Sequence, residues 1–172
     1  MAVVFSITSG CGEPRPGALR DQWELSNAGL RIRGEIYDEG NLSHRLAVFD
    51  ERRCHLLLRT AVGGEQWHDI VRAYFAPCDK DIRRHVRFVS GSVAYVFLQW
   101  WYMVTVDGGR TWTTWDVPAK IPRLAYANPT LIEEVVVAPD GTGTMTLNPA
   151  GTINHERARL RTTDFGRAWV AP

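Results

Sequence analysis

One eight-residue phrase recurs three times in this chain and constrains its fold more than any other feature. Residues 105–112 read TVDGGRTW, residues 162–169 read TTDFGRAW, and residues 60–67 read TAVGGEQW. The closing tryptophans, Trp67, Trp112 and Trp169, lie 45 and 57 residues apart. A phrase that returns at spacings of about 50 residues indicates an internally repeated architecture.

Each copy of the phrase predicts a tight turn between two β-strands. Asp and Gly tolerate positive φ angles, and an Asp carboxylate can accept hydrogen bonds from the turn's own backbone. The tryptophan opens the next strand, and its ring can fold over the turn and bury a large apolar area. We therefore expect a structural role for the residues at the fixed positions: Thr60, Gly64, Trp67, Thr105, Asp107, Gly109, Trp112, Thr162, Asp164, Gly166 and Trp169.

The phrase resembles the Asp-box, or BNR repeat, of sialidases and other β-propeller proteins, which reads Ser/Thr-x-Asp-x-Gly-x-Thr-Trp. Residues 105–112 meet every fixed position, whereas residues 162–169 depart at Ala168 and residues 60–67 depart at Val62 and Gln66. In those proteins the box closes the hairpin between the third and fourth strands of a blade. The resemblance implies an all-β fold, a small or incomplete β-propeller-like array of about 3–4 four-stranded blades with Asp-box hairpins.

The segments between the phrases also predict strands. Counting back from each phrase gives about three strands before it and one after it, which makes a four-stranded blade. We expect residues 1–172 to form a single domain, with a partial blade at 1–28 and blades at about 29–70, 82–117 and 131–171. Two options stay open: a small closed ring, or an open array whose blade edges invite pairing with a partner or with a second copy.

Composition and charge limit the class of partner. The formal net charge is +1, which argues against a broad nucleic-acid-binding surface. No run approaches the ~20 apolar residues of a membrane helix. Cys11, Cys54 and Cys78 are an odd number without metal-ligand spacing, which favours free thiols in a reducing compartment. We expect a cytoplasmic protein that binds neither nucleic acid nor membrane.

A binding site is expected on the connections opposite the recurring phrases. Two of these connections, residues 71–84 and 118–130, are about 13 residues long, and loops of this length are often functional. Arginine and aromatic side chains are typical anchors of protein interfaces. The predicted partner-binding residues are Arg53, Arg72, Tyr74, Arg83, Lys120, Arg123, Tyr126 and His155. The most basic patch, residues 83–87, could meet an acidic partner surface or simply form a solvated hairpin edge.

Catalytic chemistry is not indicated. Retaining glycosidases need two carboxylates ~5–5.5 Å apart, whereas Glu133 and Glu134 are neighbours on a presumed strand and are expected on opposite faces. The five histidines lack metal-ligand spacing, and no Gly-x-Ser-x-Gly or Cys-His signature occurs. We therefore expect no enzyme, no metal and no other cofactor.

These observations favour a non-catalytic protein-binding module. The resemblance to standalone Asp-box domains without active-site residues implies a bacterial immunity or inhibitor protein that blocks a toxin or effector by steric occlusion. The alternative is a carbohydrate-binding or sialidase-like domain, in which Trp100 or Trp115 would stack on sugar rings. A third possibility is an assembly factor for a membrane complex.

Overall fold

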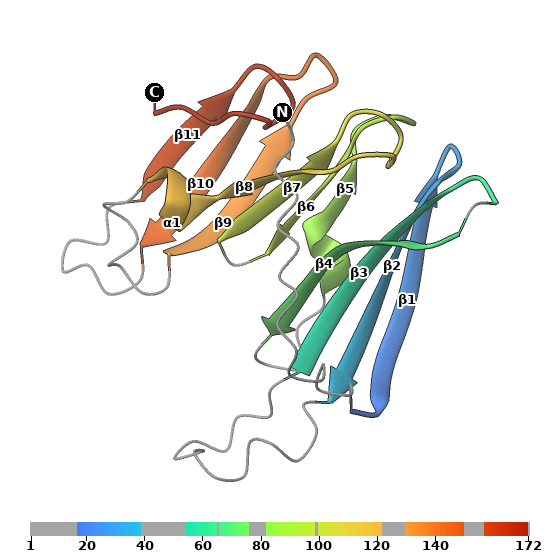
Figure 1. The fold of residues 1–172 in the computed structure, drawn as a ribbon. Coiled ribbons are helices and arrows are strands. Elements are labelled where there is room, and N and C mark those ends of the chain that lie inside the picture. The colour runs from blue at the N-terminus through green and yellow to red at the C-terminus, as the bar shows by residue number, and fades with distance from the viewer. Residues whose placement is uncertain are drawn as a thin grey trace, which may run out of the picture.

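The chain forms three small antiparallel sheets that follow one another in chain order (Figure 1). The computed structural model describes residues 17–38, 54–64, 66–75, 82–98, 100–121, 130–149 and 157–171. The prediction of an all-β fold is confirmed. No helix in these described segments has the length and apolar character needed to span a bilayer.

Sheet A has the strand order β1-β2-β3-β4, with β1 at Leu19–Asn27, β2 at Leu30–Asp38, β3 at Cys54–Val62 and β4 at His68–Phe75. The strand β1, expected in a separate partial blade, instead pairs with β2 along its length. The two-residue turn of Ala28 and Gly29 explains this, because both residues have positive φ, 48° and 89°. Such a turn matches the twist of a hairpin and joins strands of one sheet.

Sheet B begins with a 3₁₀ turn, η2, and has the order β5-β6-β7-β8, followed by the short helix α1. Their bounds are Ile82–His85 for η2, Val86–Phe88 for β5, Ala94–Leu98 for β6, Trp101–Thr105 for β7, Thr113–Asp116 for β8 and Val117–Lys120 for α1. Sheet B thus has three strands before its recurring phrase and one after it, as the sequence predicts.

Sheet C has the order β11-β10-β9, with β9 at Thr130–Val137, β10 at Gly143–Pro149 and β11 at Ala158–Thr162. In the place of a fourth strand, Val170 makes an isolated bridge to Arg161. Two backbone hydrogen bonds of 2.8 and 2.9 Å hold this bridge. The third repeat therefore keeps the path of a four-stranded sheet, with a single residue in the fourth position.

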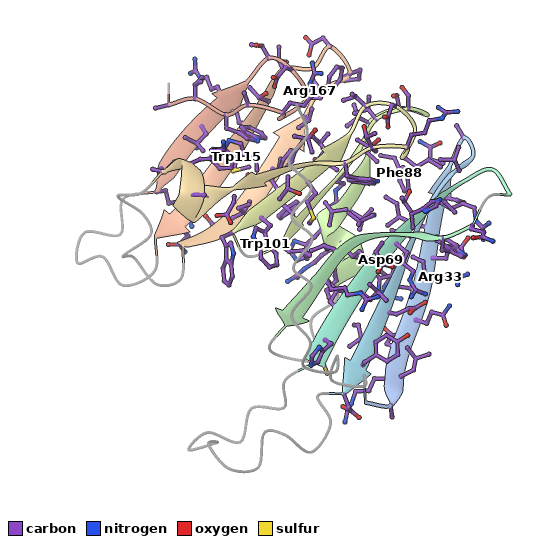
Figure 2. The ribbon with its side chains drawn as sticks, viewed as in Figure 1. Arg33, Asp69, Phe88, Trp101, Trp115 and Arg167 are labelled. Carbon is purple, nitrogen blue, oxygen red and sulfur yellow. The ribbon has the colours of Figure 1, made fainter. Side chains whose placement is uncertain are left out.

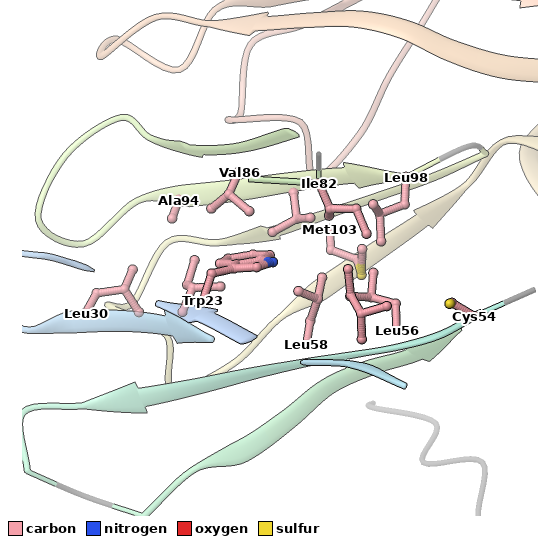
Figure 3. Close-up of a cluster of buried hydrophobic side chains, with 13 residues drawn as sticks. Trp23, Leu30, Cys54, Leu56, Leu58, Ile82, Val86, Ala94, Leu98 and Met103 are labelled. Atoms are coloured by element: carbon pink, nitrogen blue, oxygen red, sulfur yellow. The ribbon is translucent and has the colours of Figure 1, made fainter. Parts of the chain in front are cut away.

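Sheet B carries buried apolar side chains on both of its faces. Successive side chains of a strand point to opposite faces. In sheet B, β6 is buried at every position, and Ala94, Val96 and Leu98 face sheet A whereas Tyr95 and Phe97 face sheet C. The first apolar layer joins sheets A and B and is shown in Figure 3. The second apolar layer joins sheets B and C.

The outer face of sheet A carries paired charges around two buried apolar residues, Leu57 and Ala61. Arg31 pairs with Glu24 at 2.7 Å, and Arg59 lies 3.1 Å from Asp69 and 3.3 Å from the buried Glu35. Figure 2 shows Asp69 on this sheet together with Arg33. Paired charges of this kind are typical of a solvated end face, as in the terminal repeat of an array.

The outer face of sheet C is polar as well, apart from the exposed Val136. Thr144 and Thr146 on β10 stand beside Arg161 and Arg159 on β11, and both arginines are exposed. Two apolar layers between three sheets, with polar faces at either end, describe an open array among the described residues. A closed ring of three sheets would need a third apolar layer.

The meander topology gives the array two different ends. At the turn end lie the three recurring phrases and the first turn of each sheet, at residues 28–29, 89–93 and 138–142. At the loop end lie η2, α1, the end of β4 and the start of β9. The recurring phrases and the points where the chain leaves one sheet and enters the next are thus on opposite ends.

The state of Cys54 differs from the expected free thiols. Its side chain is buried and is disulfide-bonded. The two other cysteines, Cys11 and Cys78, lie outside the described residues. A disulfide is typical of an oxidising compartment, so the cysteines no longer favour a cytoplasmic location.

Candidate functional site

The recurring phrase at residues 105–112 forms a turn held by one threonine and one aspartate. The Thr105 hydroxyl donates to Asp107 Oδ1 at 2.8 Å and accepts from the Gly109 N–H at 2.8 Å. The carboxylate of Asp107 also accepts from the backbone N–H and the hydroxyl of Thr111, at 2.9 and 2.6 Å. The side chains thus satisfy backbone groups that the turn withdraws from the sheet.

The copy at residues 162–169 repeats this geometry. The Thr162 hydroxyl donates to Asp164 at 2.7 Å and accepts from the Gly166 N–H at 2.9 Å. Asp164 accepts from the Ala168 N–H at 3.0 Å, and only the hydroxyl contact is lost because alanine stands there. We call residues 105–112 and 162–169 the Thr-Asp turns.

Both aspartates in the Thr-Asp turns have a pKa below their ordinary value. Burial raises the pKa of Asp107, but the hydrogen bonds from Thr111 and Thr105 outweigh it. Burial likewise raises the pKa of Asp164, and the hydrogen bonds from Thr162 and from the Ala168 N–H outweigh it. Both carboxylates are therefore ionised structural acceptors at neutral pH.

The copy at residues 60–67 keeps the hairpin but loses this network. Val62 replaces the aspartate, and the buried Thr60 hydroxyl has no hydrogen-bond partner among the described residues. Gly64 is exposed, unlike the buried Gly109. The Gly63 N–H still donates to the Gly29 carbonyl at 2.8 Å.

That last hydrogen bond is common to all three sheets. The Gly108 N–H donates to the Ser92 carbonyl at 2.8 Å, and the Phe165 N–H donates to the Gly141 carbonyl at 2.9 Å. In each sheet, the turn after the third strand is therefore tied to the turn after the first strand. The three sheets are structural repeats even where the aspartate is absent.

The Thr-Asp turns also join each sheet to the preceding one. A Cβ on Gly109 would lie 2.4 Å from Leu30 Cδ1 in sheet A. A Cβ on Gly166 would lie 2.5 Å from the ring of Tyr102 in sheet B, whose hydroxyl donates to the Phe165 carbonyl at 2.7 Å. The turns are thus sheet-to-sheet contacts.

The three tryptophans of the phrase have different surroundings. Trp169 is buried and meets Tyr102 edge-on, with ring centroids 5.2 Å apart. Trp112 is half-buried against the first apolar layer. Trp67 is half-buried, with the guanidinium groups of Arg31 and Arg33 over its ring at 4.7 and 4.1 Å.

The structure describes half of the predicted partner-binding residues. Arg72 on β4 is exposed and pairs with Asp69 at 3.0 Å on the outer face of sheet A. Tyr74 lies in β4, while Arg83 in η2 and Lys120 in α1 are exposed at the loop end. Four more lie outside the described residues: Arg53, Arg123, Tyr126 and His155.

A groove between sheets B and C is the candidate site, and we call it the β5–β9 groove. Its cavity volume is about 780 Å³, within the range of roughly 300–1,000 Å³ that is usual for ligand pockets. One wall carries Arg84 and Arg87, the floor carries Tyr95 and Phe97, and the opposite wall is residues 133–137 of β9. Val89, which follows β5 and packs against the second apolar layer, also lines the groove.

The charges along the β5–β9 groove are only partly neutralised. Arg84 and Arg87 are exposed, and neither makes an ion pair with a described carboxylate. On the opposite wall Glu133 pairs with Arg157 at 2.9 Å, whereas Glu134 has no ion pair among the described residues. The groove therefore offers two available cations and one available anion.

The two glutamates do not alternate as predicted. Thr146 pairs with Glu134 and Leu147 pairs with Ile132, so Glu133 is the extra residue of a β-bulge. Both Ile132 and Val135 are buried in the second apolar layer, whereas both glutamates are exposed. A bulge breaks the strict alternation of a strand, and the expectation of opposite faces is wrong for this reason.

Sequence reasoning named residues 83–87 as a basic patch but missed the other walls of the groove. Tyr95 and Val135 are brought together across two sheets, and the Tyr95 hydroxyl donates to the Val135 carbonyl at 2.9 Å. The available signal was the pair of adjacent acids within the apolar run at 131–137. A charged pair in such a run indicates a strand that is not covered on both sides.

The tryptophans proposed for sugar binding are largely in the core. Trp115 is 5% exposed and belongs to the second apolar layer. Trp100 is half-buried against the same layer and meets Trp101 edge-on, with ring centroids 5.4 Å apart. Stacking on a sugar needs an open indole face, which Trp115 does not offer.

No protein-family model, no curated protein and no solved structure matches this chain. Within the described segments, no group of three or more His, Cys, Asp or Glu side chains is arranged to hold a metal ion.

Proposed function

We propose that this chain is a non-catalytic protein-binding module, built as an open array of propeller-type blades with Asp-box-like turns. The single observation that carries the proposal is the β5–β9 groove, where Arg84 and Arg87 are exposed and have no carboxylate partner among the described residues. Arginine beside aromatic side chains is the composition of an interface anchor. The predicted Arg83 lies next to this wall on the same 3₁₀ turn.

The rest of the array supports a scaffold role. The Thr-Asp turns use their polar side chains within the turns themselves. The outer face of sheet A uses most of its charges in ion pairs. Charges that are already paired contribute little to a new interface, whereas available charges steer and select a partner.

The finer form of the proposal is a bacterial immunity or inhibitor protein that occludes a toxin or effector. Its basis is the resemblance of the recurring phrase to the Asp-box of standalone interaction domains. Co-expression with the product of an adjacent toxin-like gene tests it directly. Rescue of growth supports occlusion, and continued toxicity with a folded, soluble chain contradicts it. The cytoplasm as compartment belongs to the same proposal, although the Cys54 disulfide favours an oxidising compartment. Thiol trapping of Cys54 in intact cells tests it: a free thiol supports the cytoplasm, and a disulfide contradicts it.

Affinity capture from the source cells tests the general proposal. The bait is the full chain, compared with the double variant Arg84→Glu/Arg87→Glu. The matched control is Arg159→Glu/Arg161→Glu, which reverses two exposed arginines on the outer face of sheet C. We expect one stoichiometric protein partner with the wild type and the control, and its loss with the groove variant. Recovery of no stoichiometric partner by the folded wild type contradicts the proposal.

A further inference from the structure

Two adjacent tryptophans stand at the loop end of sheet B, where β6 turns into β7 (Figure 2). The strand β6 ends at Leu98, β7 begins at Trp101, and these two residues pair, so only residues 99 and 100 connect the strands. Glycine, asparagine and aspartate are the usual residues of such a short turn, whereas this connection reads Gln99-Trp100. Turn formation therefore does not explain the tryptophan.

Neither of the two rings is fully covered. Trp100 is half-buried against the second apolar layer, and Trp101 is half-buried against the first. The Trp101 N–H donates to Asp116 at 3.3 Å, whereas the Trp100 N–H is not buried and bonds to no described residue. Tryptophan is enriched at protein interfaces because its ring is apolar at one end and can stay wet at the other. Trp100 has this arrangement.

The short helix α1 holds the tryptophan turn in place. The Val117 N–H donates to the Trp100 carbonyl at 3.0 Å. Asp116 caps the helix by accepting from the Ala119 N–H at 3.2 Å, and it is the same carboxylate that binds Trp101. An anchor that is already fixed before binding loses little conformational freedom when a partner arrives.

Cationic side chains lie on both sides of the tryptophan turn. In the strand order of sheet B, η2 precedes β5 on one side and α1 follows β8 on the other. The turn η2 packs on β6 through His85, whose ring meets Phe97 edge-on with centroids 4.7 Å apart. Arg84 on η2 and Lys120 on α1 are exposed, and neither pairs with a described carboxylate.

The acids of sheet B do not neutralise these cations. Among the described residues 82–98 and 100–121, the acids are Asp107 in a Thr-Asp turn at the opposite end and Asp116, which is engaged by Trp101 and Ala119. An apolar centre with cations on either side is complementary to an acidic surface that surrounds an apolar pocket.

A protein surface fits this arrangement better than a membrane surface. Helices that lie in a bilayer interface present a long apolar face, whereas η2 and α1 have four residues each. The guanidinium of Arg84 can meet a carboxylate at two points, which is the usual reason for arginine in a protein interface.

We propose that Trp100 is the central anchor of the partner interface. Its uncovered indole edge enters an apolar pocket of the partner protein, and Arg84 and Lys120 face acidic side chains around that pocket. The inference rests on the proposed function and extends the interface from the β5–β9 groove, through Arg84, over the loop end of sheet B.

The test measures the affinity of the purified chain for its captured partner by isothermal titration calorimetry. Trp100→Ala should weaken binding about thirtyfold or more, the usual effect of removing a hot-spot tryptophan. The matched control is Trp112→Ala, because Trp112 is also half-buried but lies at the turn end. This control removes the same ring from the opposite end of the array and should leave the affinity unchanged.

Two milder variants keep the test sharp if Trp100→Ala does not fold. Trp100→Phe keeps an aromatic ring on the second apolar layer but has no N–H, and should weaken binding about two- to tenfold. Lys120→Glu should slow association about threefold or more at low salt, because attraction becomes repulsion. The control Arg161→Glu reverses an exposed arginine on the outer face of sheet C and should leave the association rate unchanged.

Three results would overturn the inference. The first is partner binding that tolerates both Trp100→Phe and Lys120→Glu. The second is an equal loss of affinity for Trp100→Ala and Trp112→Ala. The third is Trp100-dependent sedimentation of the chain with vesicles of phosphatidylcholine and phosphatidylglycerol, which would make the turn a membrane anchor instead.

These outcomes are distinguishable from failure of the proposed function. If affinity capture recovers a stoichiometric partner whose binding tolerates the Trp100 variants, the chain is a protein-binding module that uses another surface. If the folded wild type captures no partner, the proposed function itself fails and the inference fails with it.

Discussion

The contact between each Thr-Asp turn and the preceding sheet is open to a quantitative test by glycine-to-alanine substitution. Gly109 and Gly166 have φ angles of +92° and +87°, and a Cβ at either would overlap the neighbouring sheet. Gly29 and Gly63 have φ angles of +89° and +60°, but a Cβ there meets nothing within 4 Å. All four substitutions therefore share a backbone cost, and only two add a collision.

The expected magnitudes follow from these two terms. Forcing a non-glycine residue into the left-handed region costs about 1–2 kcal/mol, so we expect this loss for Gly29→Ala and Gly63→Ala. Overpacking a filled interior adds about 1–3 kcal/mol. Gly109→Ala should therefore cost about 2–5 kcal/mol. Gly166→Ala should lie at the upper end of that range, because the opposing Tyr102 ring is fully buried and hydrogen-bonded.

Equilibrium unfolding in urea, followed by tryptophan fluorescence, measures these differences. The m-value should stay constant across the four variants, so that changes in midpoint report stability. The reasoning fails if Gly109→Ala and Gly166→Ala are no more destabilising than Gly29→Ala and Gly63→Ala. Equal losses would mean that the turns do not hold one sheet against the next.

Two further predictions concern the same turns. Trp169→Ala should cost about 3–5 kcal/mol as a buried aromatic truncation, and Trp112→Ala should cost about half as much because its ring is half-buried; equal urea midpoints for the two variants would contradict this. Asp107→Asn should lower stability at pH 7 by about 1.5–3 kcal/mol, the usual contribution of a hydrogen bond to a charged group. Its folded pKa is lowered, so this contribution is present above the ordinary carboxyl pKa and is lost as the pH falls through the folded value. The gap from the wild type should therefore narrow below about pH 4, whereas the exposed Asp21→Asn should show little gap at any pH; a gap for Asp107→Asn that persists at low pH would refute the hydrogen-bond account.

Much of the fold was predictable because it depends on local chemistry. Asp107 and Gly109 indicate a turn by their own side-chain and backbone properties. Turns also form at residues 90–91 and 139–141, where Ser-Gly and Pro-Asp-Gly are turn-forming residues. These features need no knowledge of distant contacts.

The candidate site was not predictable in the same way. The β5–β9 groove exists because Arg87 and Tyr95 in sheet B face the edge of a strand in sheet C, and no local pattern reports how two sheets are placed. The bulge at Glu133 also depends on pairing with β10.

Hydrogen–deuterium exchange of the chain, alone and with its captured partner, tests the central claim most directly. The account predicts that the partner slows amide exchange in η2, in β5 and at residues 133–137 of β9, which line the groove. It predicts little change in the Thr-Asp turns at the opposite end of the array. Protection confined to residues 105–112 and 162–169, with none along β9, would contradict the account.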